Sequence, residues 1–194
     1  ADPYFWLRDD TRSKPAVLNH LQAEHAYFTA GFAALRPLQQ RLFEEMRARI
    51  KEDDASVPAF EDGYWYYTRF ETGKQYPIFA RRRGSMDAAE QILLDGNQRA
   101  EGHNFYQAAD TTVSEDGKIM AVAEDFVGRR EYTIRFKNLE SGAWLPDEIT
   151  GVSAESVFAD DNRTVFVVEK DPTTLLPFRV KRHALGTPWA QAAT

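Results

Sequence analysis

The sequence contains no cysteine, and this absence excludes several kinds of chemistry. The 194-residue chain has no disulfide, no thiolate nucleophile and no zinc site of the cysteine type. It has no apolar run near the roughly 20 residues that a membrane-spanning helix needs, and no signal peptide is visible. We therefore expect no membrane association. The lack of cysteine does not fix the compartment, since both cytoplasmic and periplasmic proteins can lack it. We expect a cytoplasmic protein, with the periplasm as the alternative.

Basic residues are fewer than acidic residues, and the sequence lacks the familiar catalytic motifs. The chain has 24 lysines and arginines against 30 acidic residues, a net charge of −6. Nucleic-acid-binding domains are usually basic, so we expect no nucleic-acid partner. None of the serines lies in a Gly-x-Ser-x-Gly nucleophile elbow, and Ser85 and Ser141 beside glycines lack the flanking pattern. There is no Walker A loop, Rossmann glycine pattern or calcium loop.

The four histidines do not form a site either. His20 and His25 are five residues apart on a predicted helix, so they do not share a face as a zinc pair would. His25 lies on the apolar stripe of that helix, where a packing role is the simpler interpretation. His183 is predicted on the solvent side of a strand. His103 follows a glycine in a predicted loop and has no assigned role.

Charged clusters have structural explanations. Asp160 and Asp161 fall at a hairpin turn and are predicted to cap it. The basic run 81–83 is predicted to be a solvated strand edge that discourages mispairing. The acidic run 52–54 could pair with a basic partner surface, and the glycosylation sequon at Asn162 lies in a tight turn where it is taken as coincidence. We assign no catalytic, cofactor-binding or metal-binding residue.

A repeat is the strongest positive signal in the chain. The segment Val113–Val122 is echoed 45 residues later by Phe158–Val167, and Tyr132–Lys137 is echoed 46 residues later by Phe178–His183. A period of this length with a hairpin turn inside each copy is typical of β-propeller blades. Because a propeller needs at least four blades, this chain holds only part of one, about three blades.

The pattern before the repeat is helical. Apolar residues spaced by three or four predict one helix after Pro15 and a second after Pro37, joined so closely that a helical hairpin is expected. The polar stretch 51–58 marks the boundary, which gives a helical segment over 1–55 and a propeller fragment over 56–194. The blades are expected at about 57–97, 105–150 and 155–194, the last incomplete. The fold class is therefore mainly β with an N-terminal helical hairpin.

Strands are predicted from β-branched and aromatic residues between turn signals. In the middle blade, Tyr132, Ile134 and Phe136 alternate with polar residues, which predicts one buried and one solvent-exposed face. The predicted strands are 64–70, 75–82, 91–95, 111–113, 119–124, 131–139, a short edge near Trp144, 165–169 and 178–183.

Six segments in order resemble the N-terminal part of the oligopeptidase B (protease II) group, within the prolyl oligopeptidase family of serine peptidases. Any one of them would be weak evidence, but together they span almost the whole chain. The segments are Asp2–Asp10, Arg49–Pro58, Gly73–Ile78, Glu101–His103, Gly128–Tyr132 and Asp171–Leu175.

The resemblance implies a two-domain enzyme that cleaves peptides after Arg or Lys. A C-terminal α/β-hydrolase domain would carry the Ser-Asp-His triad, and a seven-bladed propeller would gate access for peptide substrates. Residues 1–55 would pack on the hydrolase domain. No position here matches a triad residue, so this chain alone is expected to be inactive and, with unfinished blades, to self-associate. The alternative is a stand-alone, non-catalytic β-rich binding or scaffold module.

Overall fold

The computed structural model describes residues 2–194, which divide into two compact units, one ending at Lys51 and one running from Glu52 to Thr194. The first unit is helical. A single 3-10 turn, η1 (Phe5–Leu7), precedes α1 (Pro15–Gly31), and the 3-10 turn η2 (Ala33–Leu35) leads directly into α2 (Arg36–Arg47). Each α-helix carries proline in its first turn, where the missing N–H has no intrahelical partner to lose.

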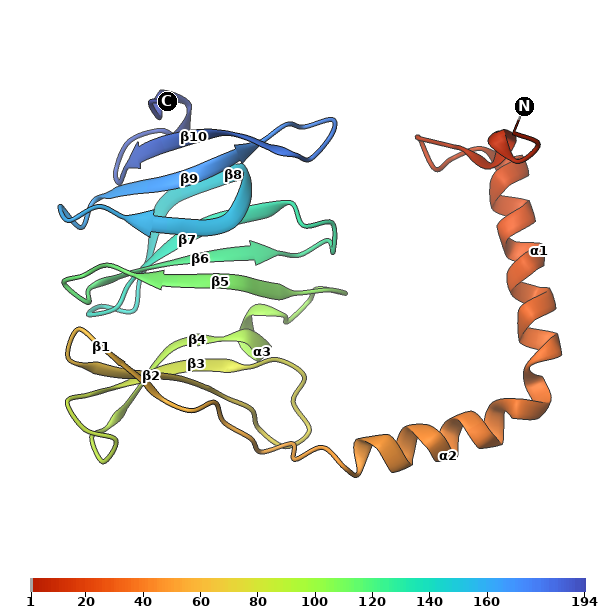
Figure 1. The fold of residues 1–194 in the computed structure, drawn as a ribbon, viewed down its shortest axis with the longest axis horizontal. Coiled ribbons are helices and arrows are strands. Elements are labelled where there is room, and N and C mark those ends of the chain that lie inside the picture. The colour runs from red at the N-terminus through yellow and green to blue at the C-terminus, as the bar shows by residue number, and fades with distance from the viewer. Residues whose placement is uncertain (1) are drawn as a thin grey trace. The chain divides into compact units, whose positions relative to one another are not determined.

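The segment before α1 is held by one carboxylate. Asp9 accepts hydrogen bonds from the backbone N–H of Lys14 at 2.6 Å and from the Thr11 hydroxyl at 2.7 Å. These bonds hold the pKa of Asp9 at about 2. α1 and α2 meet at a corner at η2 (Figure 1). The connection is as short as expected, and the two helices diverge from the corner (Figure 1).

The apolar stripes of this unit are exposed. Large apolar side chains of both helices and of the corner face solvent, and Val17 is the only residue of α1 that is buried. An amphipathic helix normally buries such a stripe, so the unit presents a surface that lacks a covering partner within residues 2–51. The large exposed apolar residues of the helices and the corner are Leu18, Leu21, Tyr27, Phe28, Phe32, Leu35, Leu38, Leu42, Phe43 and Met46.

The second unit consists of two antiparallel sheets in which consecutive strands pair (Figure 1). The four-stranded sheet has the order β1-β2-β3-β4, and the six-stranded sheet has the order β10-β9-β8-β7-β6-β5. The helical turn α3 (Gly96–Arg99) follows the first sheet, and η3 (Trp189–Gln191) lies near the end of the chain. The strands are β1 (Ala59–Glu61), β2 (Tyr64–Arg69), β3 (Ile78–Arg83), β4 (Glu90–Asp95), β5 (Gln107–Val113), β6 (Ile119–Asp125), β7 (Tyr132–Asn138), β8 (Trp144–Phe158), β9 (Thr164–Lys170) and β10 (Pro177–Ala184).

Strand β8 joins two blades into the six-stranded sheet. Its first part pairs with β7 and its second part pairs with β9, and both registers meet at Val152. Gly151, at a φ of +71°, lies at this junction. We name the first blade β1–β4, the second blade β5, β6, β7 and the start of β8, and the third blade the end of β8, β9, β10 and an isolated bridge at Ala193. The partial propeller expected from the repeat is confirmed, but the short edge near Trp144 is a 15-residue strand.

The repeated segments occupy equivalent places in the second and third blades. Val113 ends β5 and Phe158 ends β8, and each is followed by a tight turn. The two turns touch, because the backbone N–H of Asp116 donates to Oδ1 of Asn162 at 3.0 Å. The predicted cap is also confirmed, since Asp161 accepts from the backbone N–H groups of Arg163 and Thr164.

Two apolar clusters fill the spaces between blades. The cluster between the first and second blades, here called the first interface, contains Leu93, Leu94, Met120, Val122 and Leu139. The cluster between the second and third blades, here called the second interface, is larger. Its buried members are Ala121, Ala123, Ile134, Phe136, Ile149, Val152, Val165, Val167 and Leu185.

Three expectations about solvent exposure are wrong, for one physical reason. Arg81 was expected at a solvated strand edge but is only 3% exposed, and His183 was expected on the solvent side of a strand but is only 1% exposed. The polar face of β7 is half-buried, because Lys137 reaches across to the carbonyl of Leu93 at 2.7 Å. A blade of a propeller is covered on both faces by its neighbours, so polar alternation within one strand does not identify a solvent face.

Candidate functional site

The two ends of the blades differ in the length of their connections. At one end, here called the loop end, lie the connections 70–77, 96–106, 126–131 and 171–176, which have six to eleven residues. The connections at the other end, 62–63, 84–89, 114–118, 139–143 and 159–163, have two to six. The chain also runs into β1 at the loop end. There the backbone N–H of Phe70 donates to the carbonyl of Asp54, and that of Gly73 donates to Oε2 of Glu52.

The loop end collects the motifs that carry the family resemblance. Gly73–Ile78, Glu101–His103, Gly128–Tyr132 and Asp171–Leu175 are far apart in sequence, yet all lie in or beside its connections. Strand topology brings them together, because every second connection in an antiparallel blade returns to the same end. The loop end is therefore the candidate functional surface of the second unit.

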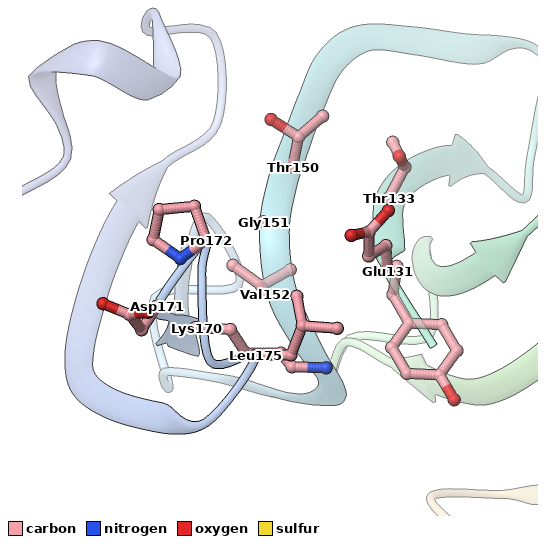
Figure 2. Close-up of a pocket in the computed structure, with 10 residues that line it drawn as sticks. Glu131, Thr133, Thr150, Gly151, Val152, Lys170, Asp171, Pro172 and Leu175 are labelled. Atoms are coloured by element: carbon pink, nitrogen blue, oxygen red, sulfur yellow. The ribbon is translucent and has the colours of Figure 1, made fainter. Parts of the chain in front are cut away.

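A pocket of about 370 Å³ opens at the loop end between the second and third blades. Figure 2 shows Glu131 and Thr133 on one side and Asp171 and Pro172 on the other. Val152, which is fully buried, and Leu175 lie between them. The pocket is lined by Glu131, Tyr132, Thr133, Thr150, Gly151, Val152, Lys170, Asp171, Pro172 and Leu175.

Asp125, at the end of β6, shapes the loop beside this pocket. Its side chain is 1% exposed and accepts from the backbone N–H groups of Val127 at 2.8 Å, Gly128 at 2.9 Å and Arg130 at 2.8 Å. Burial acts to raise the pKa of Asp125, but these backbone hydrogen bonds outweigh it and hold the pKa below its ordinary value. The carboxylate is therefore charged at neutral pH.

Lys170 and Asp171 build the opposite wall. Nζ of Lys170 donates to the carbonyl of Arg130 at 2.7 Å, which ties the third blade to the loop of the second. Asp171 accepts from the backbone N–H of Thr174 at 2.7 Å, and such bonds lower its pKa. Glu131 is exposed, and its carboxylate makes no hydrogen bond or ion pair with residues 2–194.

A buried ionic cluster at the end of β6 anchors the connection 96–106 of the loop end. Glu124 is 1% exposed and accepts two hydrogen bonds of 2.7 Å from Arg99, one of 2.9 Å from the Tyr106 hydroxyl and one of 3.3 Å from Arg135. Burial and then the charge of Glu124 raise the pKa of Tyr106, and the hydrogen bond to Glu124 raises the pKa of Arg99. Charge-assisted hydrogen bonds of this kind are short and directional, so they hold the linker after the first blade in place.

The sequence did not single out Glu124 or Asp125. The available signal was two acidic residues directly after the apolar run 119–123 with a glycine three residues later, a spacing typical of an aspartate-capped turn. Among the histidines, His103 packs its ring 4.4 Å from that of Phe126, and His20 lies 5.1 Å from Trp6. His25 is exposed and lines a groove of the helical unit.

The part of the chain that the structure describes contains no recognisable catalytic arrangement. Among residues 2–194, no serine hydroxyl is hydrogen-bonded to a histidine ring, and no cluster of three potential metal ligands exists. Nor does any helix in this part of the chain combine the length and apolarity needed to cross a membrane.

Comparison with known proteins decides the family. The model of the prolyl oligopeptidase N-terminal β-propeller domain matches residues 1–194. The chain belongs to the prolyl oligopeptidase family. Within this family it is 50% identical to dipeptidyl aminopeptidase BI of Pseudoxanthomonas mexicana over 99% of its own length, and 31% identical to protease 2 of Moraxella lacunata over 78%.

Solved structures of family members have the same fold. Oligopeptidase B from Leishmania major superposes with a TM-score of 0.92 at 35% identity, and oligopeptidase B from Trypanosoma brucei with 0.90 at 29% identity. Each match covers 99% of this chain and 27% of the solved one. The chain likewise spans 29% and 22% of the two curated relatives, so it corresponds to the N-terminal part of longer peptidases.

Proposed function

We propose that this chain is the N-terminal part of a serine oligopeptidase that hydrolyses peptides after Arg or Lys, with the triad on a separate α/β-hydrolase domain. The observation that carries the proposal is the similarity to oligopeptidase B structures over 99% of the chain. No residue of this chain takes part in the chemistry under this proposal. Its blades gate the access of peptides to the catalytic domain.

The helical unit supports a role in holding the domains together. A groove of about 770 Å³ lies between α1 and α2, and apolar side chains line most of it, including Phe28, Phe32, Leu42 and Met46. Exposed apolar surface of this kind is typical of a covered interface. We propose that residues 1–55 pack on the hydrolase domain and that residues 56–194 form the beginning of a seven-bladed ring.

The loop end supports the gating role. It carries the pocket of Figure 2 and a mixture of exposed charges, and it is the end at which the chain arrives from residues 52–58. Buried carboxylates fix its loops, so the surface presented to a peptide is preorganised rather than mobile. We propose that peptides and the catalytic domain meet the propeller at this end.

A second candidate activity is the release of dipeptides from the amino terminus of peptides. The observation that favours it is the 50% identity to a dipeptidyl aminopeptidase, against 31% to protease 2. The two activities differ in whether the substrate needs a free amino group two residues before the cleaved bond. Both would proceed on the catalytic domain.

The deciding experiment compares the full-length parent with this chain on fluorogenic Arg-Arg substrates, one with a blocked and one with a free amino terminus. Cleavage of the blocked substrate, abolished by a serine-directed inhibitor, is expected for the parent, and none for the chain alone. Cleavage of only the free substrate would favour the dipeptidyl activity. Failure of the parent on both substrates, or inhibitor-sensitive cleavage by this chain, would refute the proposal.

A further inference from the structure

The loop between β6 and β7 displays two adjacent arginines to solvent. Arg129, Arg130 and Glu131 are all exposed, and Val127 at the tip of the loop is 68% exposed. Exposed loop tips are the preferred sites of proteolytic nicking, provided that their backbone can be drawn into an active site. By residue type and exposure alone, this loop meets the requirements of a peptidase that cleaves after arginine.

The backbone of the loop has the wrong shape for cleavage. Arg130 has a φ of +57° and Gly128 a φ of +85°, so the segment is a tight turn rather than the extended strand that a peptidase groove pairs with. The arginine side chains are therefore accessible to a peptidase, whereas the peptide bonds that follow them cannot adopt the extended conformation that cleavage needs.

Two charged groups hold this turn. Asp125 accepts from three backbone N–H groups of the loop, and Nζ of Lys170 donates to the carbonyl oxygen of Arg130, which is the carbonyl of the Arg130–Glu131 bond. Asp125 belongs to the second blade and Lys170 to the third. Separation of the third blade would therefore release one of the two anchors.

We propose that residues 126–131 form a latent cleavage site for peptidases that act after arginine, and that Asp125 and Lys170 keep it closed. Cleavage breaks the amide C–N bond after Arg129 or Arg130. Water supplies a hydroxyl to the arginine carbonyl carbon and a proton to the released amine, so no other reactant is needed. That the parent enzyme is itself such a peptidase rests on the proposed function, whereas the latent site does not.

Limited proteolysis with trypsin tests whether Asp125 and Lys170 keep the loop closed in the folded chain. Near-UV circular dichroism measures whether each variant is folded. Cleavage at each site is followed by mass spectrometry. Since cleavage of a closed loop scales with the population that opens, Asp125→Asn should accelerate cutting after Arg129 and Arg130 by about tenfold or more, and Lys170→Met by about threefold. Replacing both arginines with glutamine in the Asp125→Asn chain should abolish these cuts.

Asp161→Asn is the matched control, because Asp161 caps an exposed turn with an arginine, Arg163, at the opposite end of the blades. It should leave the rate at the 126–131 loop unchanged. The proposal is overturned if the unmodified chain is cut there as fast as Asp125→Asn, if Asp161→Asn accelerates these cuts equally, or if folded Asp125→Asn stays uncut there. If Asp125→Asn does not fold, an unchanged rate in Lys170→Met overturns the proposal.

Discussion

The two interfaces between blades use the same repeat but differ in the balance of apolar and polar contacts. The second interface is mainly an apolar cluster of nine buried residues, including the fully buried Ile134 and Phe136, and strand β8 runs through it. It also contains a buried polar pair, in which Nε2 of His183 lies 2.9 Å from Oδ1 of Asp147. The first interface has five buried apolar residues and is crossed by long polar side chains. Nζ of Lys137 donates to the carbonyl of Leu93, and Nη2 of Arg81 donates to that of Gly117.

The difference teaches what each interface depends on. Apolar packing is non-directional and scales with buried area, so the second interface should be sensitive to lost volume. Hydrogen-bonded charges are directional and strongly affected by their partners, so the first interface should be sensitive to lost charge or geometry and to pH. Three substitutions separate these sensitivities.

The largest effect is expected from Phe136→Ala in the second interface. Removing a fully buried phenylalanine side chain leaves a cavity and should lower the free energy of unfolding by about 3–5 kcal/mol. Urea denaturation followed by tryptophan fluorescence measures this change. Phe60→Ala is the control, because Phe60 is 57% exposed and should change stability by less than about 1 kcal/mol. Equal effects of the two substitutions would contradict the view that volume controls this interface.

A smaller loss is expected from Glu124→Gln beside the first interface. The substitution keeps the shape but leaves Arg99 and Arg135 without their buried carboxylate. Since both arginine side chains are partly exposed, water can replace part of the lost interaction, and a loss of about 2 kcal/mol is expected rather than the larger value for a fully buried pair.

The control for charge is Glu148→Gln, whose side chain is 53% exposed and also pairs with Arg135. It should lower stability by about 0.5 kcal/mol. Stability is again measured by urea denaturation, together with hydrogen exchange of the linker 96–106. The interpretation of Glu124 as a buried anchor fails if Glu124→Gln is no worse than Glu148→Gln.

The contrast between the interfaces also explains how much the sequence could predict. The repeat, most strand positions and the cap at Asp161 follow from local signals such as turn residues and β-propensity, and the structure contains them. Strand β1 and most of β8 were not predicted. The burial of Arg81 and His183 could not be predicted, because neither a basic run at a strand end nor the alternation within a strand carries information about the blade that covers it. His183 is buried against Asp147, 36 residues away, at 2.9 Å.

The candidate site was less predictable than the fold. Its segments come from four connections whose meeting depends on the stacking of blades, and its key anchors act on backbone groups rather than through a recognisable motif. Pairing of Asp125 with Val127, Gly128 and Arg130 is local and could be suspected from spacing. The bond between Lys170 and Arg130 spans 40 residues and two blades, and no pattern in a single sequence encodes it.

The smallest effect, and the one that tests the polar character of the first interface most directly, is expected from Lys137→Met. Burial and then the nearby charge of Arg99 lower the pKa of Lys137 below 10.5. Between the folded pKa and 10.5, the unfolded chain binds more protons than the folded chain, so stability attributable to Lys137 rises with pH in this window.

Methionine at position 137 keeps the apolar stem and removes the charge together with the hydrogen bond to Leu93, so the net change in the free energy of unfolding at pH 7 should stay within about 1 kcal/mol. Urea titrations at pH 7 and near pH 10 should show that the stability gain on raising the pH is smaller in Lys137→Met than in the unmodified chain. An identical pH dependence in the two proteins would mean that Lys137 is effectively solvated. The stability of the first interface would then depend mainly on its apolar cluster, as that of the second interface does.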